Sequence, residues 1–141
     1  MLIGEHITKL GEKNRVALPK KLRSEIGDRL IITKGYEDCL IVVAQSKWEV
    51  ITKDLISKPF TSGSARDTSR FILGGAVDVE LDDQGRFVIP QNLISHADLE
   101  ESICFLGLIN WVEIWSLGKW REREEYLKTN GSEIAEKLNV S

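Results

Sequence analysis

The sequence predicts a mainly β fold with peripheral helices, an α+β class, built from two similar units. Two observations lead to this prediction. The chain of 141 residues contains an internal repeat at an offset of 71 positions, and each copy carries short apolar runs separated by turn residues. A unit of roughly 40 residues cannot bury an adequate core alone. We therefore expect the two copies to pair their strands across a pseudo-twofold axis and form one closed β-barrel.

The repeat is clearest where LGEKNRVALPKKL (residues 10–22) aligns with LDDQGRFVIPQNL (residues 81–93). Leucine, arginine, proline and leucine coincide, so that Arg15 matches Arg86. With one inserted residue the match continues to a Lys-Trp pair in each copy. The predicted organisation is a first domain at 5–47, a helix and linker at 48–75, a second domain at 76–119 and C-terminal helices at 120–141.

The same order of elements is predicted for each copy, because the turn residues and the proline recur at equivalent positions. An extended stretch leads to a tight turn, a short strand that ends in proline, and a short helix. A pair of strands and a longer helix follow. The predicted first-copy ranges are 12–14 for the turn, 20–26 for the helix, and 30–33 and 40–43 for the strands. The second-copy ranges are 83–85 for the turn and 103–106 and 112–115 for the strands.

The longer helices are predicted from their end signals. The first begins at Ser46, because Glu49 has the spacing of a capping box. The second spans residues 119–129 and ends at Asn130-Gly131, with a short tail helix after it. Residues 57–64 have the composition of a linker.

Composition and motifs exclude several classes of protein. No apolar run approaches the ~18 residues of a membrane span, and the N-terminal segment lacks a secretory stretch, so we expect a cytoplasmic protein without a membrane partner. Cys39 and Cys104 lie inside apolar runs, which indicates buried thiols. His6 and His96 are the only histidines, and no nucleophile elbow, metal-ligand pair or phosphate loop occurs. We therefore expect no enzyme, cofactor, metal or small-molecule substrate.

Charge is distributed unevenly along the chain, whose net charge is −3. Residues 1–60 carry +3 and residues 61–141 carry −6, while residues 9–23 alone carry +5. A focused basic segment on an acidic body suits a specific anionic partner, although a solvated charged face would look the same. Arginine has a planar fork of donors that suits phosphates and the guanine edge. The candidate DNA-binding residues are Arg15, Lys13, Lys9, Lys20, Lys21 and Arg86.

Asp82 lies four residues before Arg86, where the turn could fold it back to orient the guanidinium. The alternative is a structural Asp–Arg clamp that only holds the turn, and the two roles are compatible. In the first copy Gly11 stands where the second has Asp82. Arg15 therefore lacks that clamp but has lysines as neighbours, so the first copy is the better candidate for DNA binding.

The D-x-x-x-R of residues 82–86, its extension LDDQGRFVIPQNL, the later GLINWVEIWSLGKW and the first-copy LGEKNRVALPKKLR together resemble the bacterial MraZ family. That family is a two-copy version of the SpoVT-AbrB swapped-hairpin barrel. The resemblance implies a nucleoid-associated transcriptional regulator of the cell-division and cell-wall gene cluster. It also implies a ring of identical subunits, each presenting its N-terminal copy to direct repeats in promoter double-stranded DNA. Gly11 departs from the family pattern.

A second class of function stays open. Gly11 and the acidic body are compatible with a ring-forming protein-interaction module, or an antitoxin-like protein that binds a partner, in which DNA binding has been lost. A gel-shift with the protein's own promoter region separates this class from a DNA-binding regulator.

Overall fold

The computed structural model describes residues 1–139, so the last two residues of the predicted segment 120–141 lie outside the described residues. The strands are β1 (Ile3–Lys9), β2 (Arg15–Ala17), β3 (Arg29–Lys34), β4 (Leu40–Ala44), β5 (Val77–Glu80), β6 (Arg86–Val88), β7 (Ser102–Leu108) and β8 (Val112–Ser116). The helices are α1 (Lys20–Ile26), α2 (Trp48–Ile51), α3 (Lys53–Ile56), α4 (Gly63–Ile72), α5 (Gln91–His96) and α6 (Leu117–Glu136). The α+β class is confirmed.

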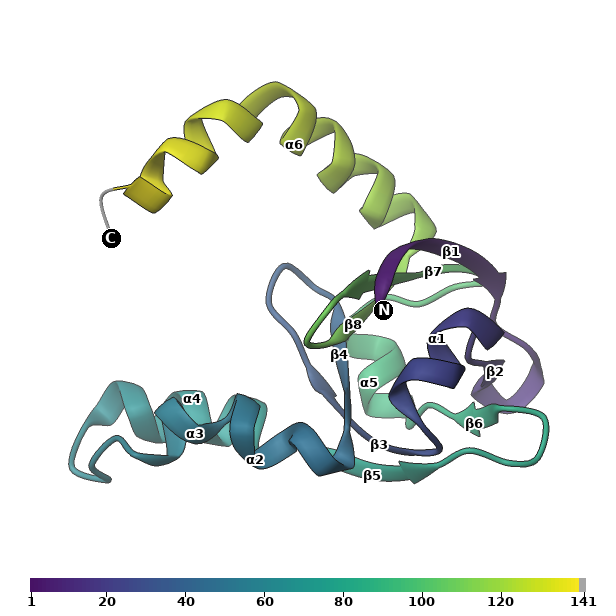
Figure 1. Ribbon diagram of the computed structural model, residues 1–141, viewed down its shortest axis with the longest axis horizontal. Helices are drawn as coiled ribbons and strands as arrows, with labels where there is room; N and C mark the ends of the chain where they lie inside the picture. The colour runs from purple at the N-terminus through teal and green to yellow at the C-terminus, as the bar shows by residue number, and fades with distance from the viewer. Residues whose placement is uncertain (140–141) are drawn as a thin grey trace.

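The main sheet is antiparallel and mixes strands from both copies in the order β1-β7-β8-β4-β3-β5. The hairpins β3–β4 and β7–β8 meet in the middle through the pairing of β4 with β8. Each copy's first strand lies on the other copy's hairpin: β1 pairs with β7, and β5 pairs with β3. The two copies are therefore interleaved in one sheet (Figure 1).

The predicted closed barrel is wrong for the described part of the chain. The six-stranded sheet is open, with β1 and β5 at its two edges, and β2 and β6 form a separate two-stranded ribbon. Each ribbon strand is three residues long and is followed within two residues by a proline, which has no N–H to continue a ladder. These strands are too short to pair beyond each other, so the ribbon does not close the sheet.

The core takes equivalent residues from both copies. Leu22 and Leu93 are fully buried, and Val16 and Phe87 from the ribbon lie in the same cluster. Since each copy contributes only part of this cluster, neither holds a core of its own, as the size of one unit predicted. Cys39 and Cys104 are buried as predicted.

Helix α1 has the predicted bounds and ends at Gly27, whose φ of 89° suits glycine. Helix α6 differs from the prediction, because it runs through Asn130-Gly131 to Glu136 as one helix. Ser116 caps its N-terminus by accepting the N–H of Lys119 at 3.3 Å. A glycine inside a helix costs about 1 kcal/mol, which is too little to end a helix that continues on both sides.

The segment after β4 also departs from the prediction. No capping box forms at Ser46: a 3₁₀ turn over Gln45–Lys47 leads into the short helices α2 and α3. Part of the predicted linker is helical, since α4 begins at Gly63 and Ser62 caps it by accepting the N–H of Ala65 at 3.2 Å. None of the helices within residues 1–139 is long and apolar enough to cross a membrane.

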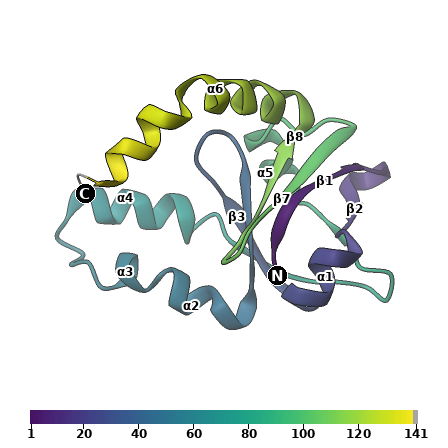
Figure 2. The same cartoon turned by 45° about the horizontal axis from the view of Figure 1, so that its top comes forward.

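Helices α2–α4 and α6 extend to one side of the β-structure. Figures 1 and 2 show α2–α4 as one arm and α6 as a second, both reaching away from α1 and the β2–β6 ribbon. The turns that precede β2 and β6 therefore lie at the end of the molecule opposite the two helical arms.

Candidate nucleic-acid interface

The β2–β6 ribbon brings the two predicted arginines onto one face. Arg15 pairs with Val88, Val16 with Phe87, and Ala17 with Arg86. Side chains alternate between the faces of a strand, and Val16 and Phe87 are 2% and 4% exposed. Arg15 and Arg86 therefore both project from the outer face, as diagonal neighbours across the ribbon.

In the second copy, the Asp82 carboxylate holds the turn and the arginine together. Its Oδ1 accepts the backbone N–H of Gln84 at 2.8 Å and that of Arg86 at 2.9 Å. Its Oδ2 accepts the Arg86 Nε at 3.0 Å. The backbone N–H of Arg86 is the main reason that the pKa of Asp82 lies below its usual value. The same contacts brace the turn and orient the Arg86 guanidinium.

In the first copy, the turn closes in the same way without a carboxylate. The Gly11 N–H donates to the Arg15 carbonyl at 2.8 Å, matching the bond from Asp82 N–H to the Arg86 carbonyl at 3.0 Å. Lys13 and Asn14 adopt φ values of 58° and 60° in this turn. Arg15 is exposed, and within residues 1–139 no ion pair or side-chain hydrogen bond fixes its guanidinium. Arg15 is therefore available to an anionic partner.

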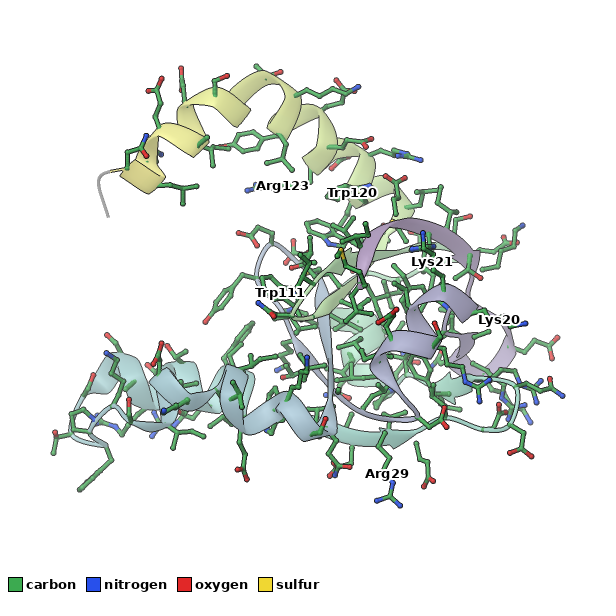
Figure 3. All side chains as sticks on the ribbon, viewed as in Figure 1. Lys20, Lys21, Arg29, Trp111, Trp120 and Arg123 are labelled. Carbon is green, nitrogen blue, oxygen red and sulfur yellow. The ribbon has the colours of Figure 1, made fainter. Side chains whose placement is uncertain are left out.

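The predicted lysines do not all have the same surroundings. Lys13 lies on the turn, and Lys20 and Lys21 lie in the first turn of α1, all exposed. Figure 3 shows Lys20 and Lys21 at the end of the molecule away from the helical arms. Lys9 instead forms an exposed ion pair with Glu101 at 3.2 Å. Lys13, Arg15, Lys20 and Lys21 form a basic surface that no acid of residues 1–139 pairs with; we call it the basic end.

Two contacts near this surface were missed by sequence reasoning. Asn14 Nδ2 donates to Gln91 Oε1 at 3.1 Å, and Arg23 is directed at Asp28 and the second-copy turn. The Asn14–Gln91 contact and the contact of Arg23 with the Asp83 carbonyl join residues of different copies, and no local pattern in the sequence marks such pairs.

The chemistry of the surface is that of anion binding. Guanidinium and ammonium groups on an exposed face suit phosphates and base edges. Among the described residues, no group of three histidine, cysteine or acidic side chains could hold a metal. His6 and His96 each contact a backbone carbonyl, those of Ile3 at 3.2 Å and Gly35 at 3.0 Å.

Comparison with known proteins identifies the family. The sequence model described as "MraZ protein, putative antitoxin-like" matches twice, over residues 1–71 and 72–140, which is the predicted repeat. A protein named transcriptional regulator MraZ from Thermoanaerobacter pseudethanolicus is 42% identical over 139 residues, covering 99% of this chain and 97% of the relative.

Two further relatives carry the same name. That of Syntrophomonas wolfei is 40% identical over 138 residues, covering 98% of this chain and 96% of the relative. That of Clostridium acetobutylicum is 42% identical over 139 residues, covering 99% and 97%. Both copies of the repeat and nearly the whole length are matched, and therefore this chain belongs to the MraZ family.

Proposed function

We propose that the protein is a transcription regulator that binds double-stranded promoter DNA through its basic end. The relatives that match its full length are named transcriptional regulators, a class distinct from enzymes. The observation that carries the proposal is the exposed Arg15 on the outer face of the ribbon, with lysines around it and no acid paired to it within residues 1–139. Such a surface suits the phosphates and base edges of a duplex.

We also propose which DNA sites the protein binds and how it assembles. The sites are direct repeats in the promoter of the cell-division and cell-wall gene cluster, and the protein acts at the nucleoid as a ring of identical subunits. The pairing of each copy's first strand with the other copy's hairpin supports a SpoVT-AbrB swapped-hairpin arrangement. A ring of such subunits would present its basic ends at regular intervals, so affinity would rise steeply with the number of repeats.

The helical arms support self-association. Arg121 pairs with Glu5 of β1 at 2.7 Å, and beyond this contact helix α6 extends away from the sheet (Figure 1), with Tyr126 and Leu127 on it exposed. On the other arm Val50 and Phe60 are 74% and 83% exposed. Isolated helices and exposed apolar side chains gain stability when another subunit covers them. Light scattering should give a mass that is a multiple of 15.9 kDa, and a monodisperse monomer would contradict the ring.

A gel-shift with the protein's own promoter region, at several salt concentrations, tests DNA binding. We expect binding to weaken as salt rises, because phosphate contacts release counterions. Fragments with one, two and three repeats test the assembly, and equal affinity for all of them contradicts the role of repeats. Absence of binding at low salt would favour the protein-interaction module instead.

A further inference from the structure

Arg23 belongs to the basic segment of the sequence, but its guanidinium contacts the protein. Its Nε donates to Asp28 Oδ1 at 3.2 Å, and the side chain is only 30% exposed. Nη1 donates to the Asp83 carbonyl and Nη2 to the Asp82 carbonyl, each at 3.4 Å. A side chain of the first copy thus contacts the turn of the second copy.

The stem of Arg23 also packs against this turn. Gly85 has a φ of 75°, and a Cβ there would lie 3.0 Å from Arg23 Cδ and 3.1 Å from Nη1. The turn therefore needs glycine for its backbone conformation, and a Cβ there would also press against the Arg23 side chain. Polar and van der Waals contacts together fix Arg23 on the second-copy turn.

The second-copy turn that Arg23 covers is joined to β2, which carries Arg15, and to α1, which carries Lys20 and Lys21. The Gly85 carbonyl accepts the N–H of Leu18 at 2.9 Å, at the end of β2. Pro19 follows, and α1 then carries Lys20, Lys21 and Arg23 itself. The second-copy turn is therefore held from two sides, by the hydrogen bond at the end of β2 and by Arg23 on α1. The orientation of α1 relative to Arg15 is thereby set through the second copy.

We propose that Arg23 is a positioning residue of the interface, which fixes α1 and the second-copy turn relative to Arg15 without contacting DNA. The guanidinium donates in several directions within one plane, which lets it reach Asp28 and two carbonyls at once. A lysine would keep the positive charge but could not reproduce this fork. That Arg23 fixes α1 and the second-copy turn does not depend on DNA binding, whereas the consequence for DNA affinity rests on the proposed function.

The first experiment measures amide hydrogen exchange without DNA in the wild type, Arg23→Lys and the control Lys21→Ala. Lys21 lies on the same helix, carries the same charge and is exposed. In Arg23→Lys we expect the Leu18 and Arg86 amides to exchange about fivefold faster, the equivalent of about one lost hydrogen bond. In Lys21→Ala their exchange should be unchanged. Circular dichroism confirms that each variant is folded at the temperature of measurement.

The second experiment measures promoter-DNA affinity and its salt dependence for the same three proteins. Arg23→Lys keeps the charge, so we expect an affinity about five- to tenfold lower with the salt slope unchanged. Lys21→Ala removes a phosphate contact, so its salt slope should fall by about one. Arg23→Ala, added as a third variant, should keep the slope of the wild type if Arg23 does not touch phosphate.

The outcomes separate the alternatives. Wild-type exchange and affinity in Arg23→Lys would overturn the positioning role. A salt slope lowered by about one in Arg23→Ala, with full affinity in Arg23→Lys, would make Arg23 a direct phosphate contact and also overturn it. If the wild type binds no promoter DNA, the proposed function fails. The exchange experiment then still decides whether Arg23 fixes α1 and the second-copy turn: faster exchange supports this, and unchanged exchange overturns it.

Discussion

Replacement of Arg15 by alanine should damage DNA binding more than the same replacement of Arg86, although both side chains project from the outer face of the ribbon. The difference lies in the surroundings. Residues 9–23 carry a charge of +5, whereas residues 80–94 contain three acids and one arginine, a charge of −2. Asp82 also accepts the Arg86 Nε at 3.0 Å, while no acid is paired with Arg15 in the described residues. Phosphates should therefore gather around Arg15.

The expected size of the effect follows from the contact that is lost. An arginine that reads a base or holds a phosphate contributes about 1–3 kcal/mol, so Arg15→Ala should weaken binding about 5- to 150-fold per engaged subunit. Several engaged subunits would multiply this loss. Arg86→Ala should weaken binding less than about fivefold. It should instead lower the melting temperature slightly, because the Asp82–Arg86 pair is exposed and screened by solvent.

The assay is operator affinity at fixed salt for both variants, with assembly checked by light scattering. Both variants should keep the wild-type assembly, since the β2–β6 ribbon lies at the end opposite the helical arms (Figure 1). If Arg86→Ala abolishes binding and Arg15→Ala does not, the second copy carries the interface and the reasoning from local charge is refuted.

Three further predictions concern stability and reactivity. Because the native pKa of Asp82 is lowered, its stabilisation is complete above the unfolded pKa of about 3.9 and is lost as pH falls through the native value. The melting-temperature gap between wild type and Asp82→Asn should thus be present at pH 7 and shrink below about pH 4; a constant gap would contradict this. Phe105→Ala should lower the free energy of unfolding by about 3–5 kcal/mol in urea titrations, because Phe105 is fully buried; a change below about 1 kcal/mol would contradict its place in the core. Burial raises the pKa of the Cys104 thiol to about 11 and raises that of Cys39, so a thiol reagent at pH 8 should label both only after unfolding; rapid labelling of the native protein would show that these thiols are accessible.

The sequence alone determined the features that depend on neighbours along the chain. The bounds of α1 and the tight turns before β2 and β6 follow from residues a few positions apart, and the repeat is visible when the two halves of the sequence are aligned. The spacing of Asp82 and Arg86 likewise brings the two side chains into contact, because a tight turn leaves little freedom over four residues. Local sequence also placed an arginine directly after each turn, so the candidate residues could be named in advance.

The tertiary structure decided what depends on contacts between distant residues. The pairing of β1 with β7 and the open sheet in place of a barrel could not be read from either copy, since strand partners are set by packing across the whole core. For the same reason, only the fold shows that Lys9 pairs with Glu101 while Lys13 has no acid partner among residues 1–139. Packing likewise directs Arg23 toward carbonyls about 60 residues away in sequence. A charge pattern counts basic residues, but only the fold shows which of them a neighbouring acid or carbonyl has already engaged.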